Sequence, residues 1–133
     1  MSFLLEKSKQ NKAAFALLTG LDHYASAVHC GYYCCIQKII YILKEYYTDE
    51  YEAGLAGLKG GHGNRHKFYI EEFAGRFSKD IGERRRLKNL LTELKHCRIE
   101  ADYHDVQVTD SRIKKVKSYL EEILRLIRKN LGL

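Results

Sequence analysis

Residues 23–47 read HYASAVHCGYYCCIQKIIYILKEYY, the longest stretch of the chain with an unbroken helical pattern. At 100° per residue, one face of this segment collects apolar side chains from Tyr24 to Tyr46, and further apolar residues widen it beyond half of the circumference. A helix that is apolar over so wide an arc needs cover from its own core and from a second surface. We therefore expect it to be the longest and most buried element of the fold.

The rest of the chain also has helical periodicity. Apolar stripes predict further helices over about 3–18, 65–77 and 83–103, and a last one after the cap candidates Thr109 and Asp110. Residues 48–63 contain five glycines and are predicted to be a mobile loop. Because no strand-like alternation is found, we predict an all-α antiparallel bundle of about five helices, forming a single domain over 1–133.

Composition limits the class of protein. The 133 residues include 45% hydrophobic and 30% charged residues, and the longest purely apolar run, 39–43, is far shorter than the ~20 residues of a membrane span. Without a signal-peptide pattern at the N-terminus, we expect a cytoplasmic protein with no membrane contact and four free cysteine thiols. The net charge of +6 lies in residues 61–133, which is compatible with a phosphate-bearing partner.

One arginine interrupts the apolar stripe of the predicted helix 83–103. Arg98 lies in the middle of the stripe, and a buried guanidinium without an anion is too costly to keep. Asp102 lies on the same face, as does Asp105 if the helix lasts that far, so either could pair with it. An Arg–Asp pair that only holds the end of a core helix would explain Arg98 without any function, and this alternative stays open.

His104 follows Arg98 after five intervening residues. On a straight helix it would lie about 240° around and about 9 Å along the axis, so the two side chains would diverge. They can serve one site only if the helix ends near Tyr103 or if two chains meet across this face. A guanidinium that binds phosphate, beside an imidazole that transfers a proton, is the minimum set of groups for cleaving RNA without metal.

Weaker candidates lie elsewhere in the chain. His62 and His66 are four residues apart, but no carboxylate or cysteine follows at ligand spacing, so we expect no metal site. His29 is interpreted as a hydrogen-bonded core residue. A basic run that could follow a phosphate backbone, although such runs are more often solvated helix starts, comprises Arg84, Arg85, Arg86 and Lys88.

The stretch CRIEADYH at 97–104 resembles the Arg-x-x-Ala-Asp-Tyr signature near the end of the fourth helix in HEPN domains, the higher-eukaryote and prokaryote nucleotide-binding helical bundles. Other segments are similar too: the N-terminal helix at 3–18, HYASAVH at 23–29 leading into Tyr32-Tyr33, and Gly-His-Gly at 61–63 before a helix with Phe73. The similarity extends over nearly the whole chain.

The resemblance implies an all-helical domain, commonly a homodimer, often encoded beside a minimal nucleotidyltransferase in toxin–antitoxin pairs. Many HEPN proteins are metal-independent ribonucleases whose arginine is followed after four to six residues by a histidine, a pattern that Arg98 and His104 fit. Asp102, Tyr103 and Asp105 would support this pair, and no cofactor is implied. The wide apolar arc of 23–47 also favours a homodimer.

The chain departs from the common ribonuclease version at two positions. Ile99 stands where that version has asparagine, and Tyr103 stands where it has the histidine. The resemblance is therefore to the Ala-Asp-Tyr branch of the family. Two hypotheses follow: an RNA-cleaving toxin or effector, or a non-catalytic nucleotide- or RNA-binding regulatory module that partners a minimal nucleotidyltransferase.

Overall fold

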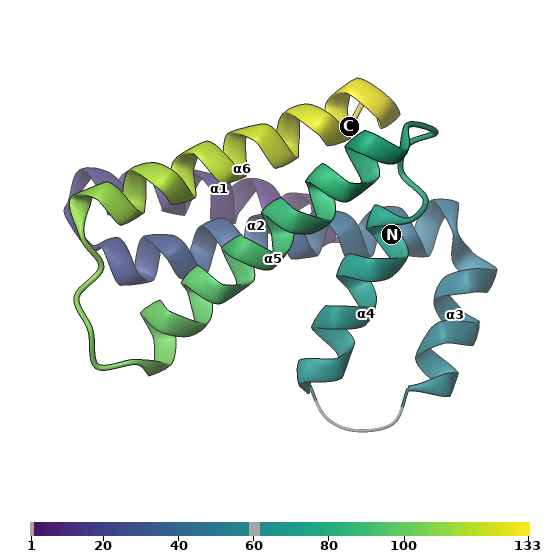
Figure 1. Ribbon diagram of the computed structural model, residues 1–133, viewed down its shortest axis with the longest axis horizontal. Coiled ribbons are helices and arrows are strands. Elements are labelled where there is room, and N and C mark those ends of the chain that lie inside the picture. Colours follow the sequence, from purple (N-terminus) through teal and green to yellow (C-terminus); the bar gives the residue numbers. More distant parts are fainter. Residues whose placement is uncertain (1, 59–61) are drawn as a thin grey trace.

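The computed structural model describes residues 2–58 and 64–133 in full and the backbone alone of residues 62 and 63. Within these residues the chain is all-helical, as predicted, and contains no strand. Figure 1 shows the arrangement of the helices α1 (Leu4–Gly20), α2 (Tyr24–Tyr46), α3 (Thr48–Gly57), α4 (His62–Ala74), α5 (Ile81–Tyr103) and α6 (Asp110–Leu131).

Helix α2 is the centre of the fold and contacts each of the five other helices. The expectation that it is the most buried element is confirmed, although α5 is equally long at 23 residues. Most of its wide apolar arc is covered by helices of the same chain, so the arc by itself gives no reason for a second copy. The buried residues of α2 are Ala27, Val28, Gly31, Tyr32, Cys34, Cys35, Ile36, Ile39, Ile42 and Leu43.

The ends of the later helices follow from local capping. Asp80 accepts hydrogen bonds from the backbone N–H groups of Gly82 and Glu83, so α5 begins two residues before the predicted position. Thr109 caps α6 by accepting from the N–H of Arg112, as predicted, whereas Asp110 is the first helical residue. Gly132 closes α6 with φ 73°, a left-handed conformation that favours glycine.

The predicted loop at 48–63 is wrong over most of its length. Residues 48–57 form α3, which carries Asp49 and Glu50 in its first turn, where acidic side chains favour a helix. Gly54 serves packing, because a Cβ atom there would lie 2.2 Å from Cε1 of the Phe68 ring. Phe68 and Tyr51 are buried together with ring centroids 6.1 Å apart, which joins α3 to α4.

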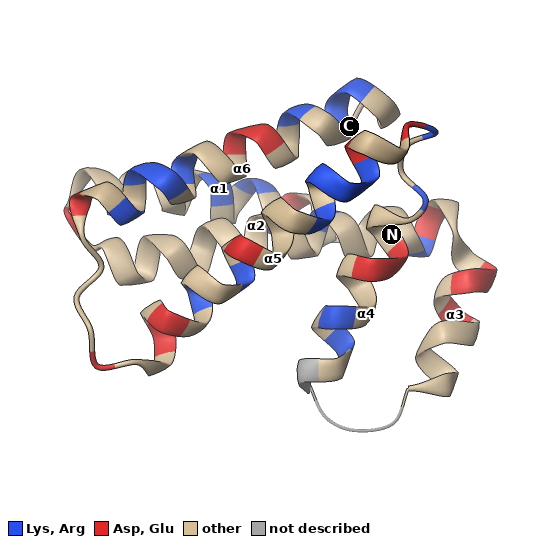
Figure 2. Cartoon of the chain, in the orientation of Figure 1, with Lys and Arg blue, Asp and Glu red and all other residues tan. Residues whose placement is uncertain are grey.

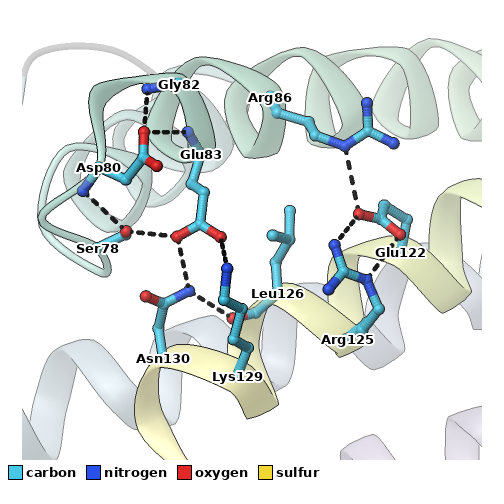
Figure 3. A network of polar contacts seen from close by, with 10 residues as sticks. All are labelled: Ser78, Asp80, Gly82, Glu83, Arg86, Glu122, Arg125, Leu126, Lys129 and Asn130. Atoms are coloured by element: carbon cyan, nitrogen blue, oxygen red, sulfur yellow. Dashed lines mark hydrogen bonds and ion pairs between the residues drawn. The ribbon is translucent and has the colours of Figure 1, made fainter.

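A polar network ties the start of α5 to the end of α6 (Figure 3). The Glu83 carboxylate accepts hydrogen bonds from Ser78 Oγ at 2.8 Å, Lys129 Nζ at 2.7 Å and Asn130 Nδ2 at 3.3 Å. The bond from Lys129, followed by that from Ser78, lowers the pKa of Glu83 from 4.5 to about 2. The carboxylate is therefore ionised at neutral pH and fixes the α4–α5 connection against α6.

No helix among the described residues has the length and apolar character needed to cross a lipid bilayer.

Replacing Gly54 by alanine tests the packing of α3 against α4. The added methyl group would overlap the Phe68 ring, so Gly54→Ala should lower the free energy of unfolding by about 1–3 kcal/mol. The matched control is Gly57→Ala in the same helix, where a Cβ meets nothing within 4 Å and stability should stay equal or rise slightly. Thermal unfolding followed by circular dichroism measures both, and equal melting temperatures for the two variants would contradict this packing.

The network around Glu83 predicts a specific acid sensitivity. Because the folded-state pKa is lower than the ordinary value, the carboxylate stabilises the fold fully above about pH 4.5 and loses this contribution as the pH falls towards 2. Glu83→Gln should be less stable than the wild type at pH 7, and the difference should shrink between pH 4.5 and 2. Glu121→Gln is the control, because the one ion pair of Glu121 within the described residues is a 3.9 Å contact with exposed Lys117. A difference that stays constant over this range would contradict the assignment.

Candidate functional site

Arg98 is buried on α5, as its place in the apolar stripe requires. Only 8% of the residue is exposed, and Leu91 and Leu94 on the same helix are fully buried. The guanidinium carbon lies 5.0 Å from the ring centroid of Tyr32 and 5.7 Å from that of Tyr33, both on α2. The aromatic faces partly replace the water that the cation loses on burial.

Asp102 is the carboxylate that pairs with Arg98. Its Oδ2 lies 3.6 Å from Nη1 of Arg98, one helical turn away, so the expected Arg–Asp pair is present. Helix α5 ends at Tyr103, which places Asp105 beyond the shared face. Among the described residues, Asp102 is the only carboxylate within ion-pair distance of Arg98. The buried Nε of Arg98 has no hydrogen-bond partner there.

The same carboxylate oxygen also binds an imidazole. Nδ1 of His29, on α2, lies 2.8 Å from Oδ2 of Asp102. The side chain of His29 is 48% exposed, so its interpretation as a core residue is wrong. Because a carboxylate can only accept, Nδ1 carries the hydrogen, and Nε2 of the neutral ring presents a lone pair. Asp102 thus holds a guanidinium and an oriented imidazole together.

A second histidine completes the aromatic lining. His66, on α4, has Nδ1 2.8 Å from the hydroxyl of Tyr32, and the two rings stack with centroids 5.7 Å apart. Burial raises the pKa of the Tyr32 hydroxyl, which therefore keeps its proton at physiological pH. The rings of Tyr33 and His29 also pack together, with centroids 4.7 Å apart. The cluster joins α2, α4 and α5 around Arg98.

Tyr103 covers the guanidinium at the outer end of the cluster. Its ring centroid lies 6.0 Å from the guanidinium carbon of Arg98, yet 74% of the residue is exposed. Val106, three residues further on, is 62% exposed. The end of α5 thus presents aromatic and apolar surface next to a buried cation.

His104 does not share this cluster within one chain. Helix α5 ends at Tyr103, which is one of the two alternative conditions for a site shared with Arg98, and His104 follows with extended backbone. His104 instead lines a hollow of about 350 Å³ with Cys97 and Arg112, on the side of α5 that faces α6. Arg98 and His104, both in the described part of the chain, share no hydrogen bond or ion pair.

The basic run at the start of α5 lies far from Arg98. Figure 2 shows Lys and Arg gathered at this end of the helix and acidic residues at the other end, and fourteen residues of helix separate Arg84 from Arg98 by about 20 Å. Arg84 donates to the backbone carbonyl of Ser78, and Arg86 pairs with Glu122 at 3.3 Å. Arg85 and Lys88 are exposed. Only half of the run is therefore free to meet an external phosphate.

Metal-binding side chains do not gather in the described residues, which hold no group of three His, Cys, Asp or Glu in ligand geometry. The side chain of His62, considered with His66 as a zinc ligand, lies outside the described residues. All four cysteines are free thiols, as expected, and Cys34 is buried in α2. Burial, followed by the charge of Asp102, raises the pKa of Cys30.

Four residues of the site were not predicted from the sequence: His29, Tyr32, Tyr33 and His66. A signal for three of them was present, because His29, Tyr32 and Tyr33 follow an i, i+3, i+4 spacing that places them on one face of α2. Their polar partners lie on other helices, Asp102 of α5 for His29 and His66 of α4 for Tyr32, which only the packing of the helices could show. His66 had no local signal.

Comparison of the chain with known protein families, with curated proteins and with solved structures finds no match.

Proposed function

We propose that this chain is a HEPN-like domain that cleaves RNA without metal at a site centred on Arg98. The observation that carries the proposal is the shared carboxylate of Asp102, which holds the guanidinium of Arg98 at 3.6 Å and the imidazole of His29 at 2.8 Å. One group suited to phosphate and one suited to proton transfer thus converge from α5 and α2. The basic second half of the chain supports an RNA substrate.

The chemistry assigns a role to each group. Arg98 binds a nonbridging oxygen of the scissile phosphate, and Nε2 of His29 accepts the proton of the adjacent 2′-hydroxyl. The 2′-oxygen then attacks phosphorus, and the bond from phosphorus to the 5′-oxygen breaks. The 5′-oxygen takes a proton from a second imidazole. The products are a 2′,3′-cyclic phosphate and a 5′-hydroxyl end.

A homodimer would supply the second imidazole. His104 lies at the end of α5, next to Tyr103 and Val106, whose exposed surface suits a contact between two copies. If two such ends meet, His104 of one copy reaches the Arg98 cluster of the other. In this arrangement His29 acts as the base within the chain and His104 acts as the acid across the interface.

A second candidate is a non-catalytic domain that binds RNA or a nucleotide and regulates a minimal nucleotidyltransferase. The burial of Arg98 favours it, because a guanidinium already neutralised by Asp102 and enclosed by tyrosine rings can have a structural role alone. The two candidates differ in whether RNA is cleaved.

Cleavage assays in the presence of a chelator separate the candidates. The wild type should produce 2′,3′-cyclic phosphate ends, and His29→Ala should reduce the rate by about 100-fold or more while the fold stays intact. Arg98→Ala should abolish cleavage and also destabilise the protein by about 1–3 kcal/mol, because Asp102 loses its cation. His96→Ala removes an exposed imidazole of α5 and is the control. Wild-type protein that binds several RNAs and cleaves none would leave only the binding domain.

Mixing of inactive variants tests where each imidazole comes from. An equal mixture of Arg98→Ala and His104→Ala protein should regain about a quarter of the wild-type activity, because half of the random dimers are mixed and each has one intact site. A mixture of Arg98→Ala with His29→Ala should stay inactive, because these two groups belong to the same chain. Full activity of His104→Ala by itself, or no recovery in the first mixture, would contradict the site between two copies.

A further inference from the structure

A groove lies between α1 and α6. Both helices pack on α2, and the space left between them has a volume of about 440 Å³, within the range of small-molecule sites. Its apolar floor consists of Phe15, Leu120 and Leu124. Gly31 of α2 lies directly beneath, because a Cβ there would be 3.1 Å from the Phe15 ring and 3.7 Å from Leu120.

The rim of the groove is strongly basic. It carries four cations, Lys12, Lys117, Arg125 and Arg128, and one acid, Glu121. Arg125 is held by Glu122 at 2.6 Å, and Lys117 lies 3.9 Å from Glu121. Lys12 and Arg128 form no ion pair with any residue in the described ranges.

Lys12 and Arg128 lie close enough to a third cation, Lys38, to change its pKa. The charges of Arg128 and Lys12, together with burial as the largest cause, lower the pKa of Lys38 on α2. Three helices thus each contribute a cation to one region. The mutual repulsion of these charges would be relieved by an external anion.

We propose that the groove between α1 and α6 binds an amphipathic carboxylate, a ligand with one anionic head and an apolar body of about eight to twelve carbons. The head pairs with Lys12 and Arg128, and the body lies on Phe15, Leu120 and Leu124. An inorganic phosphate or an RNA backbone would gain nothing from the apolar floor. A neutral or cationic amphiphile would leave the rim charges unpaired.

Octanoate is the probe, measured by isothermal titration calorimetry with the full chain. It should bind saturably with one molecule per chain, whereas 1-octanol should bind at least about tenfold more weakly and inorganic phosphate should not compete. The double variant Lys12→Gln/Arg128→Gln should weaken octanoate binding by at least about tenfold. Lys114→Gln/Lys115→Gln removes the same charge from exposed positions outside the groove and should bind like the wild type.

A second variant tests the floor independently of charge. Ala16 is exposed and lines the groove, so Ala16→Phe should fill it and abolish binding while the circular dichroism spectrum stays unchanged. The proposal would be overturned if octanoate and octanol bound equally well, or if the two charge variants lost the same amount of octanoate affinity. It would also be overturned if octanoate bound to Ala16→Phe as it does to the wild type. A change of sedimentation coefficient in Ala16→Phe would overturn it as well, because the groove would then be a contact between copies.

Discussion

The enclosure of α2 is the constraint on which the rest of the structure depends. Ten of its residues are buried, and every other helix is placed by its contact with it. Gly31 shows how close this packing is, because any side chain there would press against Phe15 of α1. The five helices around α2 cannot cover its surface evenly. Where α1 and α6 pack on α2 without filling the space between them, a groove remains, and where α4 and α5 pack on it, polar side chains of α2 are enclosed.

The second of these regions contains the polar cluster. Tyr32 and Tyr33 stand on the face of α2 that meets α5, so Arg98 enters a space lined by rings rather than by aliphatic groups. The Arg98 cation then requires a carboxylate, and Asp102 is one helical turn away. His29 reaches the same carboxylate from α2, so the ion pair also joins two helices. The packing of α5 on α2 and the polar contacts of Arg98 therefore depend on each other.

The sequence predicted the elements better than their contacts. Periodicity identified five of the helices because their stripes are long and regular, and Thr109 marked the start of α6, which depends only on local geometry. It missed α3 because glycine was interpreted as loop-forming, whereas Gly54 is needed for the approach of Phe68, a residue of another helix. It identified Arg98 and Asp102 because both lie on one helix. It could not identify His29 as their partner, since that pairing depends on how α2 and α5 cross.

The geometry of Arg98 also bears on whether its role is only structural. A buried ion pair stabilises a fold well when its hydrogen bonds are complete, and an apolar side chain of similar size is often equally good. At Arg98 the pair with Asp102 is 3.6 Å long and Nε has no partner among the described residues, so the guanidinium is incompletely satisfied. Its covering group on the outer side, Tyr103, is mostly exposed. The unused hydrogen-bonding capacity of this guanidinium is therefore the feature on which the proposed contact with an anionic group rests.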